Sequence, residues 1–185
     1  HEALDAATQG FKDALTEKLG DKVKFDEQNA SGDSANCSTI VNGFLSENVD
    51  LILANATAPL QAAAAATSEI PVLGTSVTDY ATALEISDWT GTVGNNVSGT
   101  SDLAPLDQQA AMIKELFPDA KKVGLLYCSA EPNSVYQCDT IEGYLKDEGY
   151  EVERYAFTDT NDVTSVTQTA CDNSDVIYIP TDNTA

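Results

Sequence analysis

The order of apolar and polar positions along the chain predicts alternating helices and strands. Apolar residues at helical spacing mark the helices, such as the first, which we expect to end near Gly20. Short β-branched and aromatic runs bounded by Asp, Gly or Pro mark the strands. The expected helices lie at 4–20, 34–45, 58–67, 106–117, 134–148 and 162–171, and the expected strands at 23–25, 51–53, 70–74, 89–97, 123–127, 150–157 and 176–179.

Strands separated by helices of this length favour βαβ units with right-handed crossovers. We therefore predict an α/β fold with two Rossmann-like lobes, each built on a parallel sheet, over residues 1–98 and 99–185. The first lobe has no strand before its first helix, and the second stops in the loop after its third strand. The chain is accordingly interpreted as an incomplete fragment of such a fold.

Two strand ends repeat one pattern. In Asp50–Thr57 and again from Asp175 to Thr184, an Asp precedes an apolar strand, and small polar residues follow it. Open α/β sheets bind ligands just past the carboxyl ends of their parallel strands. We interpret the two strand ends as the two walls of one binding site.

Neutral donors and acceptors dominate these strand ends. Thr57, Thr75 and Ser76 offer hydroxyls from the first lobe, for a ligand or merely for the strand ends themselves. Asn133 and Ser134 open a helix whose backbone N–H groups suit a ligand carboxylate. The alternative for both residues is helix capping alone, with Ser134 and Gln137 at capping-box spacing.

Asp182 is the carboxylate that would neutralise a ligand ammonium; its alternative role is to accept a turn N–H. A helix N-terminus paired with a carboxylate matches the two ends of a zwitterion. We therefore predict an amino acid ligand, with a sugar-like ligand as the alternative. Sugar sites usually recruit several charged planar groups, whereas this chain has nine Lys and Arg in total.

The charge balance narrows the class of partner. The 185 residues include 30 acids against nine bases, a formal net charge of −21. Such a surface repels phosphate backbones, so we expect no nucleic-acid binding. The longest apolar stretches fall short of the roughly 20 residues that a membrane span needs.

The residues for catalysis or for a cofactor are missing from the sequence. The glycines of 94–99 do not join a strand to a helix, as a dinucleotide site requires. The single histidine, His1, stands at the start of the chain, and the four cysteines are scattered. We expect no enzyme activity, no cofactor and no metal site.

Two of the cysteines are candidates for a disulfide if the protein is exported. Cys128 ends a strand and Cys138 follows on the inward face of the next helix. A bond between them would close a loop worth about 2–3 kcal/mol in the chain-entropy model. The alternative is a pair of buried free thiols.

Three segments resemble a known family: Gly99–Asp102, Leu126–Val135 and Tyr178–Thr184. They are similar to the substrate-binding proteins of ABC importers associated with tryptophan, tyrosine and phenylalanine uptake. The resemblance covers essentially the whole chain and implies the type I periplasmic-binding-protein fold. It departs from the family at Glu2, where relatives commonly have proline, and in the cysteines, which relatives usually lack.

The resemblance implies an extracytoplasmic, lipid-anchored solute receptor. It would close two lobes over an amino acid, aromatic or apolar, and deliver it to ABC permease subunits, with a lipid anchor outside this chain as its only membrane contact. A ligand-sensing domain of a receptor or regulator on the same fold is the alternative. The implied ligand-side positions are His1, Thr57, Thr75, Ser76, Asn133, Ser134, Asp182 and Asn183.

Overall fold

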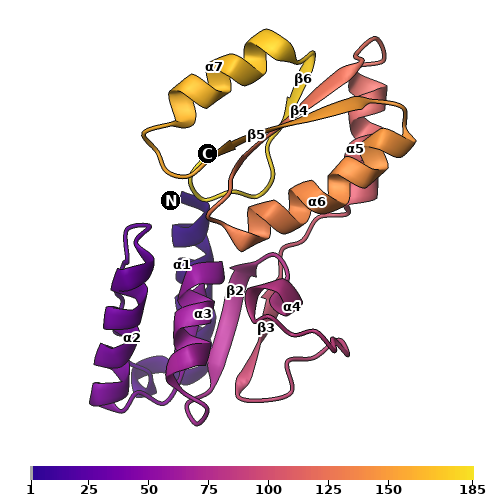
Figure 1. Cartoon of the computed structure of the whole chain (residues 1–185). Coiled ribbons are helices and arrows are strands. Elements are labelled where there is room, and N and C mark those ends of the chain that lie inside the picture. The colour runs from indigo at the N-terminus through magenta and orange to yellow at the C-terminus, as the bar shows by residue number, and fades with distance from the viewer. Residues whose placement is uncertain (1) are drawn as a thin grey trace. The chain divides into compact units, whose positions relative to one another are not determined.

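The computed structural model describes residues 2–185, and the chain divides into two compact units, His1–Asp102 and Leu103–Ala185 (Figure 1). Each unit is a parallel three-stranded sheet with helices on both faces. Together with the alternation of helix and strand, these sheets confirm the predicted α/β class.

The first unit has the strand order β1-β2-β3. An aspartate caps the second helix: the carboxylate of Asp33 accepts from the backbone N–H groups of Ala35 and Asn36 in the first turn of α2. The strands are β1 (Ile52–Asn55), β2 (Val72–Val77) and β3 (Val97–Ser101). The helices are α1 (Glu2–Leu19), the 3-10 turn η1 (Gly20–Lys22), α2 (Ser34–Glu47), α3 (Thr57–Ala66) and the short α4 (Tyr80–Ala83).

Alternation along β1 places α1 and α3 on opposite faces of this sheet. Ile52 and Ala54 are buried in one core with Leu60 of α3. The next residue, Asn55, points to the other face, where its amide donates to the Leu4 carbonyl of α1 at 2.6 Å. The carboxyl end of β1 is therefore joined to the start of the chain's first helix.

The second unit has the strand order β5-β4-β6, with β4 in the centre. Its core explains the continuous apolar run of β4, because a central parallel strand is covered on both faces. The elements are α5 (Leu106–Leu116), β4 (Lys122–Cys128), α6 (Pro132–Asp147), β5 (Glu151–Phe157), α7 (Val163–Asn173) and β6 (Val176–Tyr178).

Successive residues of β4 contribute to two separate cores. Leu125 and Tyr127 pack with residues of α5 and α6, whereas Leu126 and Cys128 pack with Ala170 of α7. Figure 1 shows α5 and α6 on one side of this sheet and α7 on the other.

This two-sided core makes the predicted disulfide wrong. All four cysteines are free thiols. Cys128 faces the α7 side of the sheet, while Cys138, on α6, belongs to the core of the opposite side. The sheet itself separates the two sulfur atoms, because the side chains of a strand alternate between its faces.

Two predicted strands are also wrong. Residues 23–25 form no strand, since Phe25 stays 39% exposed and packs on the Lys12 ammonium, 5.9 Å from the ring centre. In the segment predicted at 89–97, Gly91 and Gly94 adopt positive φ and turn the chain, so the strand starts only at Val97. The sequence patterns also missed α4.

Candidate functional site

In the first unit, polar groups gather where β1 and β2 end. Asn55 lies opposite Thr75 in the parallel register, and the next amide, Ala56 N, donates to the Thr75 carbonyl at 2.9 Å. Ala56 has φ +91° and ψ 169°, a conformation that is essentially restricted to glycine. Helix α3 follows at once, and its first residue, Thr57, is buried.

Thr75 and Ser76 lie within β2, whereas the predicted strand ended at Gly74. The strand continues to Val77, with a shift of register against β3 between Gly74 and Val77. Ser76 is in the left-handed region at φ +54°. Both hydroxyl residues are half-buried, beside the start of α3.

In the second unit, the segment after β6 is held by an aspartate. The carboxylate of Asp182 accepts from the backbone N–H of Cys128 at 2.7 Å, from Thr184 N at 2.9 Å and from Ala185 N at 2.8 Å. A carboxylate has about four lone-pair sites. Among the described residues, three donors are present, which leaves one site for a further donor.

Glu131, just before α6, is a second carboxylate in contact with this segment. It accepts from the backbone N–H of Asn183 at 3.0 Å, from the Asn183 side-chain amide at 2.8 Å and from the Thr184 hydroxyl at 2.6 Å. The side-chain amide of Asn133 donates to it at 3.1 Å. Four donors occupy this carboxylate fully.

Two amide side chains of α6 hold Thr181 as well. Asn133 donates to the Thr181 carbonyl at 2.9 Å, and Gln137 both donates to that carbonyl at 3.3 Å and accepts from Thr181 N at 3.1 Å. Gln137 is buried. Sequence reasoning missed Gln137 and Glu131 as parts of the site, although Glu131 before Pro132 matches the position preceding a helix that starts with proline.

The start of α6 differs from the predicted capping box. The helix begins at Pro132 with Glu131 at the N-cap position, so Ser134 lies inside its first turn and is fully buried. The Ser134 amide donates to the Glu131 carbonyl at 3.1 Å. The backbone N–H of Asn133 has no acceptor among residues 2–185. It is therefore the N–H group of this turn that a ligand anion could use.

The structure thus brings the predicted site residues together in two groups, one at the carboxyl strand ends of each unit. His1 lies outside the described residues. The first group is Thr57, Thr75 and Ser76, and the second is Asn133, Ser134, Asp182 and Asn183.

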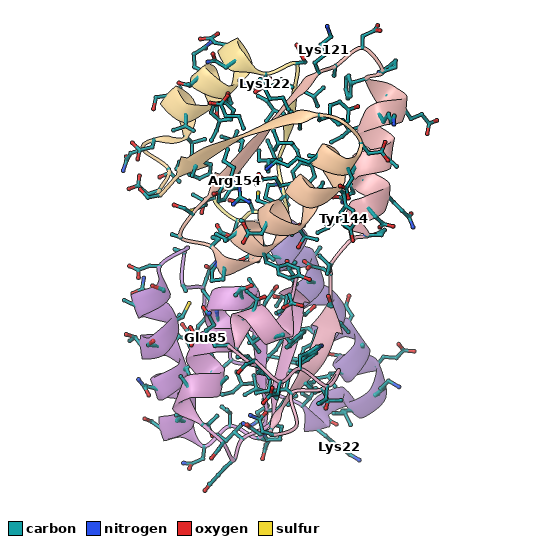
Figure 2. The ribbon with its side chains drawn as sticks, turned by 45° about the vertical axis from the view of Figure 1, so that its right-hand side comes forward. Lys22, Glu85, Lys121, Lys122, Tyr144 and Arg154 are labelled. Atoms are coloured by element: carbon teal, nitrogen blue, oxygen red, sulfur yellow. The ribbon has the colours of Figure 1, made fainter. Side chains whose placement is uncertain are left out.

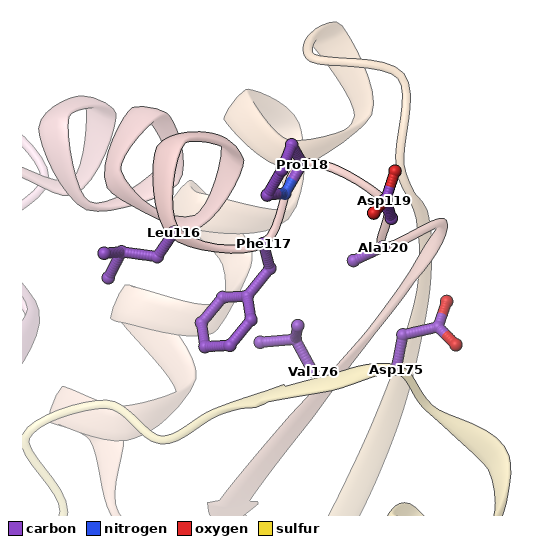
Figure 3. Close-up of a pocket in the computed structure, with 7 residues that line it drawn as sticks. All are labelled: Leu116, Phe117, Pro118, Asp119, Ala120, Asp175 and Val176. Carbon is purple, nitrogen blue, oxygen red and sulfur yellow. The ribbon is translucent and has the colours of Figure 1, made fainter.

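Other features of the second unit lie away from these strand ends. A hollow of about 390 Å³ is lined by Leu116, Phe117 and Asp175 among others (Figure 3). It lies where β4 and β6 begin, whereas Asp182 lies beyond their carboxyl ends. Arg154 of β5, labelled in Figure 2, pairs with Asp139 and Glu142 in a surface ion-pair cluster.

Two titratable groups in the core of this unit have raised pKa values. Burial raises the pKa of the Cys138 thiol and that of the Tyr178 hydroxyl to about 12 each. Both groups therefore stay protonated near neutral pH. In residues 2–185 we find no cluster of metal-ligating side chains.

A comparison with known families identifies the family of this chain. The family described as "ABC transporter substrate binding protein" matches residues 1–185. The chain belongs to this family. Its members are extracytoplasmic solute-binding proteins, and the fold is that of type I periplasmic binding proteins. No helix in the described part of the chain has the length and apolar character of a membrane span.

Three relatives illustrate the similarity. The chain is 39% identical to the "Tyrosine-binding protein" of Clostridioides difficile strain R20291, over 99% of this chain and 54% of that protein. A Streptococcus pneumoniae ABC domain in complex with L-Trp shares 34% identity at a TM-score of 0.92, covering 100% of this chain and 63% of that one. A conserved domain protein of Vibrio cholerae shares 35% identity at a TM-score of 0.90, covering 96% and 61%. The chain therefore spans roughly half to two thirds of the length of these relatives.

Proposed function

We propose that this chain is the ligand-binding part of an ABC importer's solute receptor and that its ligand is an amino acid. The family assignment supports the receptor role. The ligand would be delivered to permease subunits, and the receptor would be held at the cell surface by a lipid anchor outside this chain. Both are proposals for the whole protein.

The observation that carries the ligand class is the spare acceptor of Asp182. Its three backbone donors orient the carboxylate and leave one lone-pair site. A ligand ammonium is a donor of the complementary charge. Glu131, with four donors, offers no such site.

The carboxylate of the amino acid requires donors. In this proposal the backbone N–H of Asn133, which has no acceptor among residues 2–185, provides one of them. Thr57, Thr75 and Ser76 of the first unit are ligand-side positions by family resemblance. Ser134 and Asn183 support the site from within the second unit, and His1 is a further ligand-side position by family resemblance.

Among amino acids, we expect the ligand to be one with an aromatic side chain. One relative carries tyrosine in its name, and the structure of another contains L-Trp. L-Tryptophan and L-tyrosine are therefore the first ligands to test.

A thermal-shift screen tests the proposal. The twenty amino acids and common hexoses and pentoses are added singly, since a ligand that binds only the native state raises the melting temperature by mass action. We expect L-tryptophan or L-tyrosine to give the largest shift, with calorimetry to confirm one site. Stabilisation by sugars and by no amino acid would contradict the proposal.

A further inference from the structure

We propose that Glu131 is a positioning residue for ligand binding: it fixes the segment 181–185 so that the Asp182 carboxylate has its binding orientation. This inference rests on the proposed function. It assigns Glu131 no contact with the ligand.

The contacts of Glu131 reach far along the chain. Its carboxylate is bound by Asn183 and Thr184, which lie 52 and 53 positions later. Glu131 itself is anchored at the N-cap position of α6. A negative side chain is favourable there, because the helix N-terminus carries partial positive charge. The carboxylate therefore joins the segment 181–185 to a rigid element.

Thr184 transmits this anchoring to Asp182. Its hydroxyl donates to Glu131 at 2.6 Å, while its backbone N–H donates to the Asp182 carboxylate at 2.9 Å. Asn183, between them, donates twice to Glu131. Both residues that follow Asp182 are thus fixed by Glu131, and one of them orients the ligand-side carboxylate directly.

The chemistry of the contacts requires a carboxylate. All four groups that face Glu131 are donors, from Asn133, Asn183 and Thr184. A glutamine would turn its own NH₂ group toward one or more of them. A donor would then face a donor. Glu131→Gln therefore disrupts these hydrogen bonds although it hardly changes the shape of the side chain.

The experiment uses the full-length protein that contains this chain, with L-tryptophan and L-tyrosine as probes. Calorimetry gives the dissociation constant for Glu131→Gln, and for Glu115→Gln as the matched control on the exposed surface of α5. We expect a tenfold to hundredfold weaker affinity for the first variant and no change for the second, at a temperature at which both are folded. Hydrogen exchange of the segment 181–185 should become faster only in Glu131→Gln.

A double mutant separates positioning from a general loss of stability. If Glu131 acts through Asp182, then Glu131→Gln should weaken binding much less in an Asp182→Asn background than in the wild type. Equal losses in both backgrounds would overturn the proposal. A Glu131→Gln variant with wild-type affinity and unchanged exchange would overturn it too.

Two further outcomes are distinguishable. If Glu131→Gln does not fold, Thr184→Val removes only the hydroxyl donor, and we expect about threefold to tenfold weaker binding from it; unchanged binding and exchange would overturn the proposal. If wild type binds no amino acid, the proposed function fails, and the positioning of Asp182 for such a ligand fails with it. The exchange measurement would still show whether Glu131 fixes the segment.

Discussion

The backbone N–H of Cys128 donates a 2.7 Å hydrogen bond to the carboxylate of Asp182, 54 positions later in the chain. This bond joins the last residue of β4 to the segment that follows β6. Since β4 is the central strand of its sheet, this bond fixes Asp182 to the middle of the sheet. A candidate ligand-binding carboxylate therefore also has a structural role.

Replacing Asp182 by asparagine should weaken both ligand binding and folding. Loss of a charged partner for the ligand ammonium should cost about 2–5 kcal/mol of binding free energy. The new NH₂ group would also face a backbone donor, Cys128 N or those of Thr184 and Ala185, at a cost of about 1–3 kcal/mol in stability. Calorimetry with L-tryptophan and a thermal melt measure the two effects.

Asp147→Asn is the matched control, because Asp147 is an exposed residue at the far end of α6. Both quantities should stay at the wild-type value in this variant. An Asp182→Asn protein that is less stable but binds as tightly as wild type would assign Asp182 a structural role alone.

The cysteines should differ sharply in reactivity. Cys171 is exposed, whereas Cys37, Cys128 and Cys138 are buried, and burial raises the pKa of the Cys138 thiol to about 12. Because the thiolate is the reactive form, iodoacetamide at neutral pH should modify Cys171 first and Cys138 only on unfolding. Peptide mass spectrometry after brief labelling measures this order.

A thiol titration of the unfolded protein tests the absence of a disulfide. After denaturation without reductant, four thiols per chain should be titrated. A linked peptide containing Cys128 and Cys138 would contradict the placement of these side chains on opposite faces of the sheet.

Ala56→Gly should stabilise the protein. Ala56 has φ +91° and ψ 169°, which glycine adopts without the steric cost of a Cβ. That relief of about 1–3 kcal/mol exceeds the entropic cost of a glycine, roughly 0.5–1 kcal/mol, so the net gain should be about 1 kcal/mol. Urea unfolding measures the free energy.

Ala54→Gly is the matched control two residues earlier in β1. Ala54 is buried in an ordinary strand, where glycine only loses packing and adds flexibility, so stability should fall by about 1 kcal/mol. The two Ala→Gly changes should thus have opposite signs. A destabilised Ala56→Gly variant would show that no strain is relieved at this position.

Much of the fold could be predicted from the sequence, because the signals are local. The apolar run of β4 and the Asp33 cap of α2 each depend on a few neighbouring residues. The failures have local causes as well: Val23–Phe25 is too short to bury its side chains, and Gly91 turns the chain. Burial and turn conformation are properties that periodicity alone does not contain.

The candidate site was harder to predict. Its residue types at the strand ends are visible in the sequence, and the structure groups them within each unit. The bonds from Cys128 to Asp182 and from Asn183 and Thr184 to Glu131 are not visible, since each joins residues more than 50 positions apart. No local pattern reports such a pairing, so the contacts required the structure.

The pH dependence of stability should include a contribution from Asp175 at acid pH. Backbone N–H groups of Lys121 and Lys122 donate to its carboxylate at 2.8 and 2.9 Å, and these bonds lower the pKa of Asp175 below its ordinary value. A group whose pKa is lower in the folded state contributes stability above its unfolded pKa and loses it as pH falls through the folded pKa.

Asp175→Asn, which cannot titrate, should therefore show a shallower fall in unfolding free energy below about pH 4. Urea unfolding of both proteins between pH 3 and pH 7 measures the slopes, with Asp172→Asn, at an exposed position of α7, as the control for the loss of one surface charge. Parallel curves for wild type and Asp175→Asn would show that the two backbone bonds do not favour the charged carboxylate.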